Sequence, residues 1–357
     1  MCPTPETKSL ISIAMLLLGS VVSIIGIFNN SILLIAFLRS SKCFKSYFHF
    51  LMILSLLDII ISVCYIPVIV VDSLKDWLLM VELARLWWTY FVYLLTLTSI
   101  AMTASSLVLA CASYERYLVT INSHWLQYYQ SKRSLLCLGS FGIAILSKGG
   151  YLIELDVFES EDPSCKGTIM EKYVDLTPIA NSLLYGSVYK FWLRQLVTVF
   201  APFALLTIIN LKTILQLKKH LTPKSSLRTD NDYRARRSLG KTQVRSATRS
   251  LLFLCLLYLL SNLPNVIISS IEFIDMEKLQ TAYLDLYLFV TDLISFLVVC
   301  ACALRLPIYL ACNAEIRQLV QKSFFSFAHK SSFKLGSLLK SPNRSLHDEI
   351  HSFEQFL

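Results

Sequence analysis

The amino-acid sequence predicts an all-α membrane protein, a seven-transmembrane helix bundle with a short amphipathic helix after helix 7. Of the 357 residues, 55% are hydrophobic and only 16% are charged, whereas soluble domains carry about 25% charged residues. The apolar residues form seven long blocks, and about 20 apolar residues are needed for one helix to cross a bilayer. Backbone groups in lipid must be satisfied within the segment, and alternating barrel segments are absent from the sequence, so we expect helices.

The seven blocks follow one another with short connections. The first block differs from a cleaved signal peptide, whose apolar region has about 7–15 residues behind a basic start. Only Lys8 precedes this block, and Arg39, Lys42 and Lys45 follow it, so we expect it to be retained as the first helix. The predicted spans are Leu10–Leu38, Tyr47–Leu74, Leu86–Ala112, Leu135–Leu155, Phe191–Leu217, Leu251–Ile274 and Tyr283–Cys312.

Charge asymmetry predicts the side of the membrane on which each connection lies, because Lys and Arg accumulate in cytoplasmic loops. The segment 218–249 contains ten basic residues against two acidic ones, and the connections on the opposite side are acidic. We therefore expect residues 1–9 to be extracellular, 10–312 to form the membrane domain, and 313–357 to be a cytoplasmic surface helix and tail. The net charge of +9 then reflects orientation in the plasma membrane and not a nucleic-acid partner.

No pattern in the sequence points to an enzyme, a cofactor or a metal. None of the ten cysteines shows paired C-x-x-C spacing, and H-E-x-x-H, G-x-S-x-G and P-loop motifs are absent. The two halves of the chain also lack matching Gly- or Pro-broken helices, which a transporter would predict. Cys165 stands apart because it lies in an acidic, extracellular connection, and we expect most of the other cysteines to pack as small apolar residues.

Several polar residues and prolines lie inside or at the edges of the predicted spans, where ionisable groups are costly and usually functional. Asn30 lies in the first span and Asp58 in the second, and Glu115-Arg116-Tyr117 ends the third at the predicted cytoplasmic face. Prolines remove a backbone donor and bend a helix. The other members of this set are Pro202, Pro264, Arg305, Pro307, Tyr309, Asn313 and Arg317.

This order of residues resembles the rhodopsin-like (class A) G protein-coupled receptors over the whole membrane region. The residues that carry the resemblance are Asn30, Asp58, the Asp/Glu-Arg-Tyr-like stretch Glu115-Arg116-Tyr117, Pro202, Pro264 and Tyr309. The resemblance implies an extracellular ligand, a heterotrimeric G protein as partner and no enzymatic activity. The segments 200–210 and 261–267 look most like invertebrate receptors for FMRFamide-like neuropeptides.

The sequence departs from that family at several positions. Helix 3 has no cysteine to pair with Cys165, and helix 4 has no tryptophan. Asn262 stands where helix 6 usually has a tryptophan, and Arg305 replaces the asparagine of the helix 7 motif, with Pro307 displaced by one residue. The activation-switch residues that the resemblance implies are Asp58, Glu115, Arg116, Tyr117, Asn262, Pro264, Arg305 and Tyr309.

Two expectations about this switch follow. Arg116 is expected to rest on Glu115 in the closed state, and the second restraint of the family, an acid low on helix 6, is missing around Arg245, which predicts ligand-free signalling. Arg305 is expected to pair with Asp58 and to displace the sodium ion that this aspartate helps to bind in the family. The alternative for Arg305 is a side chain that snorkels to the cytoplasmic headgroups.

The expected ligand is a short cationic, amidated neuropeptide, because acidic outer loops attract cations. Helix 3 has no aspartate near Thr98, where the amine receptors of this family place the partner of the ligand's ammonium group. This argues against a biogenic amine as the ligand. A chemosensory receptor for a small molecule is the alternative, and a transporter is a weaker one. Arrestin and a kinase at the serine-rich tail, and membrane lipid, are further expected partners. The candidate pocket residues are Thr98, Ser99, Met102, Arg194, Asn265, Ser269, Glu272 and Asp292.

Overall fold

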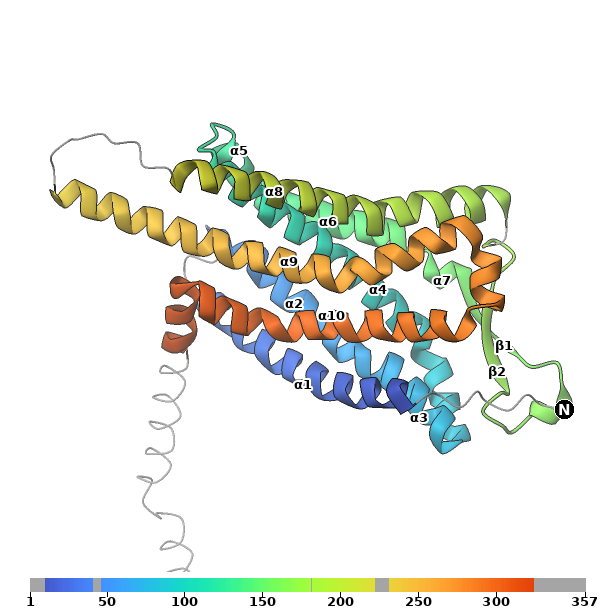
Figure 1. The fold of residues 1–357 in the computed structure, drawn as a ribbon. Coiled ribbons are helices and arrows are strands. Elements are labelled where there is room, and N and C mark those ends of the chain that lie inside the picture. Colours follow the sequence, from blue (N-terminus) through green and yellow to red (C-terminus); the bar gives the residue numbers. More distant parts are fainter. Residues whose placement is uncertain (1–9, 41–45, 181, 222–230, 324–357) are drawn as a thin grey trace, which may run out of the picture.

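The fold is a bundle of long helices that lie side by side (Figure 1). The computed structural model describes residues 10–40, 46–180, 182–221 and 231–323. Within these residues, seven helices are long and apolar enough to cross a membrane, which confirms the predicted fold class. The elements are α1 (Leu10–Leu38), α2 (Phe48–Tyr65), η1 (Ile66–Val70), α3 (Val71–Leu78), α4 (Val81–Thr120), α5 (Leu126–Ser131), α6 (Arg133–Lys148), α7 (Tyr151–Glu154), η3 (Leu183–Leu193), η4 (Leu196–Phe200), α8 (Ala201–Leu221), α9 (Asn231–Thr281) and α10 (Leu284–Cys312).

Several helices extend beyond the apolar blocks that predict them. Helix α4 begins at Val81 and ends at Thr120, and α9 begins at Asn231, inside the segment predicted as a basic loop. A helix satisfies its own backbone in water as well as in lipid, so hydropathy marks the membrane part and not the helix end. The N-terminal nine residues and the tail from 324 onward lie outside the described residues.

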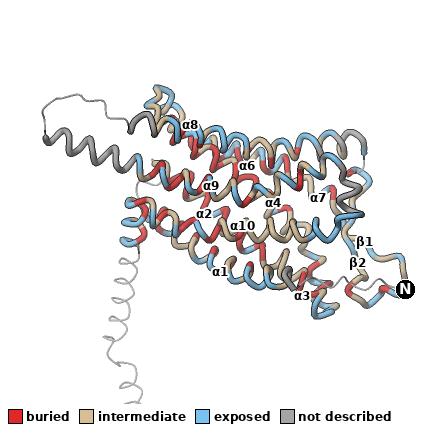
Figure 2. Tube along the Cα trace, in the orientation of Figure 1, coloured by how far each residue is buried: buried red, intermediate tan, exposed pale blue. Residues whose placement is uncertain are grey.

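The core lies around α4, which is the most buried of the seven spans. In α4, 56% of the most apolar window is buried inside the bundle, and Figure 2 shows buried positions along its length. Val108 and Leu109 of α4 belong to one hydrophobic cluster with Leu51 and Leu54 of α2. Because lipid tails are as apolar as leucine, this association depends on close packing and on buried polar contacts.

Small residues bring α1 close to α2. A Cβ added to Gly19 would overlap the Tyr65 hydroxyl, and one added to Gly26 would lie 2.9 Å from Ser62 Oγ. Between them, the hydroxyl of Ser23 donates a hydrogen bond to the Ser62 carbonyl. These three positions form one face of α1, so the two helix backbones approach closely enough for polar contacts across the interface.

Two of the prolines lie in or just after π-helical turns. Pro67 lies inside η1, and Pro202, the second residue of α8, lies two residues after the end of η4. A proline has no N–H, so the usual helical bond is lost and the local turn widens. Side chains of α4 satisfy the carbonyls of η1, because Trp87 Nε1 donates to Val68 at 3.3 Å and the Tyr90 hydroxyl donates to Pro67 at 3.2 Å.

A β-hairpin lies over one end of the bundle. Strands β1 (Leu155–Glu159) and β2 (Lys172–Leu176) pair antiparallel, with Val157 opposite Val174. Arg85 of α4 lies 3.1 Å from Glu171, and the hydrogen bond from Arg85 lowers the pKa of that exposed carboxyl. Cys165, in the turn η2 (Pro163–Cys165), is buried and disulfide-bonded. The cysteines on the described helices are free thiols, so this bond does not tie the hairpin to helix 3.

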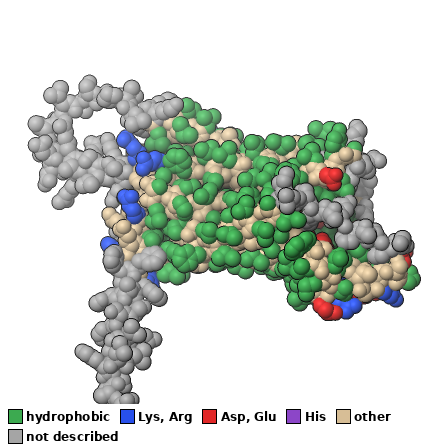
Figure 3. Space-filling view, turned by 60° about the horizontal axis from the view of Figure 1, so that its bottom comes forward, with side chains coloured by type: hydrophobic (Ala, Val, Ile, Leu, Met, Phe, Trp, Pro, Cys, Tyr) green, Lys and Arg blue, Asp and Glu red, His purple; other side chains and the backbone are tan. Residues whose placement is uncertain are grey.

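The surface divides into an apolar belt with two polar ends (Figure 3). On the face shown, Lys and Arg gather at one end, while carboxylates lie toward the other, next to a few basic side chains. The first is the basic end, where Arg39, Arg249 and Arg317 lie exposed. The second, which carries β1 and β2, is the hairpin end. A belt with polar rims is the surface expected of a bilayer-spanning bundle.

A short helix follows α10 at the basic end. Residues 314–323 are helical, and Asn313 caps this helix because its Oδ1 accepts from the backbone N–H groups of Glu315, at 3.1 Å, and Ile316, at 3.4 Å. Ile316 and Val320 are buried on one side of the helix. This agrees with the predicted amphipathic surface helix as far as residue 323.

Candidate functional site

A cavity of about 780 Å³ lies between the helices toward the hairpin end. Its volume falls within the range of about 300–1,000 Å³ that is usual for ligand sites. Its lining is rich in hydroxyl and amide groups and includes Lys148, Arg194 and Glu272 as charged residues. Thr98 and Asp292, two of the predicted pocket residues, do not line it. The predicted residues that do are Ser99, Met102, Arg194, Asn265, Ser269 and Glu272.

A buried ion pair supports one wall of this cavity. Arg194, which follows η3, contacts the carboxylate of Glu154 at the end of α7, and both side chains are buried. The Tyr185 hydroxyl donates to Glu154 Oε1 at 2.8 Å. Gly150 leaves room for this cluster, because a Cβ there would lie 2.6 Å from the Tyr185 hydroxyl and 2.9 Å from Glu154 Oε1. The predicted pocket residue Arg194 therefore has a structural partner of its own.

A second wall carries Glu272 near the hairpin end of the α9 span. The Tyr287 hydroxyl of α10 donates to Glu272 Oε1 at 2.9 Å, and Gln195 Nε2 lies 3.4 Å from Oε2. Gln195 also reaches Ser269 Oγ at 3.5 Å. Glu272 is half-buried, and Lys148 interacts with it electrostatically without a described hydrogen bond.

Asn262 and Tyr258 of α9 lie at the floor of the cavity. Both residues, with Met102 and Val298, also line a second cavity of about 50 Å³ that reaches Arg305. Asn262 Nδ2 donates to the Tyr258 carbonyl at 3.0 Å, and Pro264 lies inside α9 only two residues away. The position that the family fills with tryptophan thus separates the ligand-sized cavity from the ionic centre of the bundle.

The ionic centre is the pair of Asp58 and Arg305. Arg305 Nε lies 2.8 Å from Asp58 Oδ2, and the two side chains are 9% and 0% exposed. Arg305 Nη2 also donates to Ser105 Oγ at 3.2 Å. A guanidinium this deeply buried does not snorkel to headgroups. The pairing expected from the sequence is therefore present in the structure.

Two asparagines fasten α1 to α10 beside this pair. Asn30 Nδ2 donates to the Cys302 carbonyl at 2.9 Å, and Asn29 Nδ2 donates to the Ala303 carbonyl at 2.8 Å. Pro307 has no N–H, so the Ala303 carbonyl lacks the donor that a helix normally supplies from four residues further on. Asn29 replaces that donor, and an unsatisfied carbonyl in lipid is avoided.

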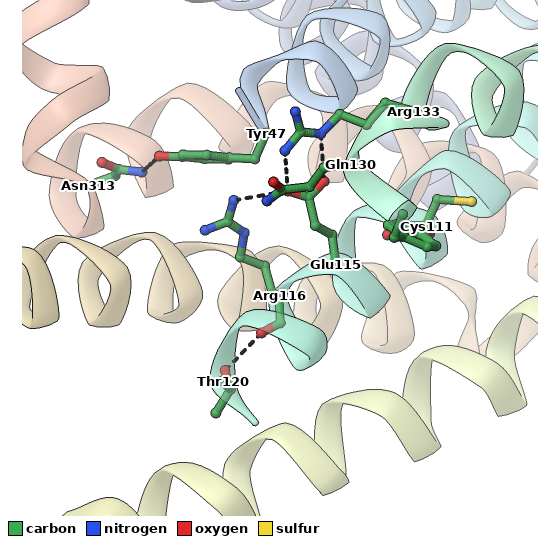
Figure 4. A network of polar contacts seen from close by, with 9 residues as sticks. Tyr47, Cys111, Glu115, Arg116, Thr120, Gln130, Arg133 and Asn313 are labelled. Carbon is green, nitrogen blue, oxygen red and sulfur yellow. Dashed lines mark hydrogen bonds and ion pairs between the residues drawn. The ribbon is translucent and has the colours of Figure 1, made fainter. Parts of the chain in front are cut away.

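A network of charged and polar residues lies at the basic end (Figure 4). Its centre is Glu115 of α4, which is fully buried. Arg133, at the start of α6, donates to Glu115 through Nη2 at 2.6 Å and Nε at 2.9 Å. Gln130 Nε2 adds a weaker contact at 3.4 Å. Arg133 therefore forms a bidentate pair, the strongest geometry for an arginine and a carboxylate.

Arg116 pairs with Glu115 as expected from the sequence, but at longer range than Arg133 does. Its Nη2 lies 3.8 Å from Glu115 Oε1, because Arg133 already occupies the carboxylate. The Arg116 guanidinium also lies over the ring of Tyr47, 3.9 Å from the ring centroid, and a cation over an aromatic face is attracted to it. Asn313 Nδ2 donates to the Tyr47 hydroxyl at 3.0 Å, and burial raises the pKa of Tyr47 to about 12.

Tyr309 links this network to the ionic centre. It is fully buried, one helical turn beyond Arg305, and it lines a small cavity together with Tyr47 and Arg116. Tyr117 is only half-buried, and its ring lies 6.3 Å from the ring of Tyr114. Tyr309 thus lies between Arg116 and Arg305 along the bundle, whereas Tyr117 is not part of this series.

Sequence reasoning missed Tyr47, Arg133 and Asn29. Arg133 lies next to basic loop residues, and the orientation of the protein in the membrane already explains their positive charge. Tyr47 is the first residue of a predicted span and has no other distinguishing signal. The adjacent Asn29 and Asn30 were the one available signal, because two amides inside an apolar block need two sets of partners.

These features define a seven-helix membrane protein in which buried polar residues join a ligand-sized cavity at one end to a charged network at the other. A family model of the seven-transmembrane receptors of the rhodopsin family matches residues 29–305. The chain belongs to this family. It is therefore a multi-pass G protein-coupled receptor of a non-enzymatic family that responds to extracellular ligands and couples to heterotrimeric G proteins. A comparison with curated proteins finds no match, and the FMRFamide-like subgroup stays a prediction.

Proposed function

We propose that this receptor binds a short cationic peptide with an amidated C-terminus in the 780 Å³ cavity and activates a G protein through Arg116. The observation that carries the proposal is the continuous series of polar residues between the two ends: Asn262 at the cavity floor, Arg305 below it, and Tyr309 beside Arg116. A ligand that moves the cavity floor is coupled by direct packing to the residues around Arg116.

The ligand's positive charge is inferred from the groups that it would meet. Glu272 lines the cavity without a basic partner in hydrogen-bonding contact among the described residues. Exposed carboxylates such as Glu159, Glu161 and Asp175 lie around the hairpin. A field of one sign at the mouth of a cleft raises the local concentration of oppositely charged ligands. A small-molecule chemosensory ligand is the second candidate, because the cavity volume suits a ligand of that size.

In the proposed mechanism α9 is the moving element. Pro264 removes one backbone hydrogen bond of α9 beside Asn262, so a small change at the cavity floor swings the basic end of the helix. Arg116 then leaves the ring of Tyr47 and contacts the G protein. The G protein binds at the basic end, which places that end in the cytoplasm of cells whose plasma membrane carries the receptor.

The orientation and the further partners are part of the same proposal. With the basic end inside, the N-terminus is extracellular and the Ser-rich tail is cytoplasmic, where a kinase and an arrestin would act. An antibody against an N-terminal tag should label intact cells, and one against a C-terminal tag should label only permeabilised cells. The reverse pattern would contradict the orientation.

The function is tested by a peptide-library screen in cells that carry a promiscuous G protein, with calcium as the readout. At matched surface expression, Arg116→Ala should abolish every response of the wild-type receptor. Arg317→Ala, which removes an exposed arginine at the same end, should leave responses intact. A response that survives Arg116→Ala contradicts the proposed switch, and a response only to non-peptide molecules supports the chemosensory alternative.

A further inference from the structure

Two basic side chains flank one aromatic ring on the wall of the cavity. Lys148 Nζ lies 5.3 Å from the centroid of the Tyr151 ring, and Arg194 Cζ lies 4.8 Å from it. All three residues line the 780 Å³ cavity. They come from the end of α6, from α7 and from the turn after η3, so three separate elements place positive charge on one stretch of wall.

The cations of this stretch are not both hydrogen-bonded to a carboxylate among the described residues. Glu154 is the carboxylate in contact, and Arg194 already binds it. The described contact of the Lys148 ammonium is with the Tyr151 hydroxyl, at 3.3 Å. Arg194 is 4% exposed, and its Nε has no acceptor among the described residues. Glu272, the other carboxylate of the cavity lining, interacts electrostatically with Lys148 but accepts its described hydrogen bonds from Tyr287 and Gln195. The wall therefore holds an ammonium with no hydrogen-bonded carboxylate among the described residues, and one buried donor of Arg194.

A cation inside a membrane protein is costly, and its cost falls when a carboxylate is supplied in hydrogen-bonding contact. Charge-assisted hydrogen bonds to Lys and Arg are among the strongest available to a ligand. Lys148 is half-buried and is one of the residues that line the cavity, so a ligand bound there contacts it. The Tyr151 hydroxyl, which lies beside Lys148, adds one more polar group at the same place.

We propose that Lys148 and Arg194 form an anion subsite that binds a carboxylate of the ligand. This rests on the proposed function, and it adds a requirement to it: the ligand carries an acidic group in addition to the cation that Glu272 binds. Glu272 and Lys148 line the same cavity and interact electrostatically, so the two subsites lie close enough for one short ligand to fill both. A peptide with an amidated C-terminus supplies the carboxylate from an acidic side chain. A peptide with a free C-terminus supplies it from the terminal carboxylate.

The test uses short arginine-containing peptides made in sets of four. Each set has Asp or Asn at one position, combined with a free or an amidated C-terminus. Binding is measured on purified receptor as the rise in unfolding temperature, so that it is scored whether or not a peptide signals. The wild-type receptor should bind the members with a carboxylate about 10- to 100-fold more tightly than the member with none. The set also shows which source of carboxylate the subsite accepts.

Lys148→Gln should remove this preference, Lys148→Arg should retain it, and Lys148→Glu should reverse it. Lys166→Gln, which removes an exposed lysine of the hairpin outside the cavity lining, is the matched control and should change nothing. Equal binding of all four members by the wild type overturns the proposal, as does an acid preference that survives Lys148→Gln. Failure of the proposed function looks different: Glu272→Gln would leave arginine-dependent binding unchanged, or binding would occur without Arg116-dependent signalling.

Discussion

Replacing one partner of the Asp58–Arg305 pair should strongly destabilise the bundle. The two groups lie 2.8 Å apart and are almost completely buried. At that distance and an effective dielectric constant of about 20, their attraction is about 6 kcal/mol. Part of it offsets the desolvation of the two charges. Removing one partner leaves the other charge buried, which typically costs about 3–5 kcal/mol.

The perturbation is a double-mutant cycle of Asp58→Asn, Arg305→Asn and the combination. In Asp58→Asn the guanidinium keeps only the contact with Ser105 at 3.2 Å, so we expect a loss of about 3–5 kcal/mol and lower surface expression. The double variant should be more stable than either single variant, because no lone charge remains. The assay is reversible unfolding of purified receptor in bilayer discs, with ligand-free samples at one pH and salt concentration.

The same cycle reports on sodium. In Arg305→Asn the Asp58 carboxylate is free to accept a small cation, so sodium should stabilise this variant relative to an equal concentration of a large organic cation. Sodium should have no such effect on the wild type, because Arg305 already neutralises Asp58. The reasoning is refuted if Asp58→Asn is as stable as the wild type, if the coupling energy is close to zero, or if Arg305→Asn shows no sodium effect.

Three further predictions concern polar contacts elsewhere in the bundle. Tyr47→Leu removes the ring beneath Arg116 and should raise ligand-free G protein activation above the wild-type level, measured at matched surface expression. Asn29→Leu leaves a carbonyl of α10 unsatisfied and should lower the free energy of unfolding by about 1–3 kcal/mol. Gly150→Val should disrupt the Glu154 cluster and lower the unfolding temperature, whereas Gly139→Val, where a Cβ meets nothing within 4 Å, should not.

Each of these predictions has a matched control. Tyr128→Leu removes a tyrosine that is 62% exposed and should leave basal signalling unchanged. Phe28→Leu alters a lipid-facing neighbour of Asn29 that is 65% exposed and should have little effect on stability. Basal activity of Tyr47→Leu at or below wild type would mean that the ring does not restrain Arg116. Equal behaviour of the two glycine variants would contradict the packing argument for Gly150.

Hydropathy and charge were sufficient for the seven spans, and the Asp58–Arg305 pair could be expected once the family resemblance put both residues in one region. Long apolar blocks have few alternatives in lipid, and two opposite charges buried in one bundle need each other. The choice between Arg116 and Arg133 as partner of Glu115 was not predictable in the same way. Both are basic residues near the same helix end, and the outcome depends on which guanidinium reaches the carboxylate with two donors.

Helix rotation limits the prediction of the pocket. Ser99 lines the cavity and Thr98 does not, although the two are adjacent on α4. One residue corresponds to about 100° around a helix, so a sequence that locates the outer third of a span does not decide which side faces inward. The role of Tyr47 depends in addition on the contact of its hydroxyl with Asn313, which is far away in the chain.

The measurement that tests the central claim most directly is G protein activation by the purified receptor, with and without binding peptides, for wild type and Arg116→Ala at equal receptor concentration. We predict activation by the wild type above a receptor-free control even without ligand, a further rise with a peptide that binds the cavity, and neither effect for Arg116→Ala. Activation by the wild type no higher than the receptor-free control under both conditions, or equal activation by Arg116→Ala, would contradict the claim that this bundle passes a signal from the cavity to Arg116.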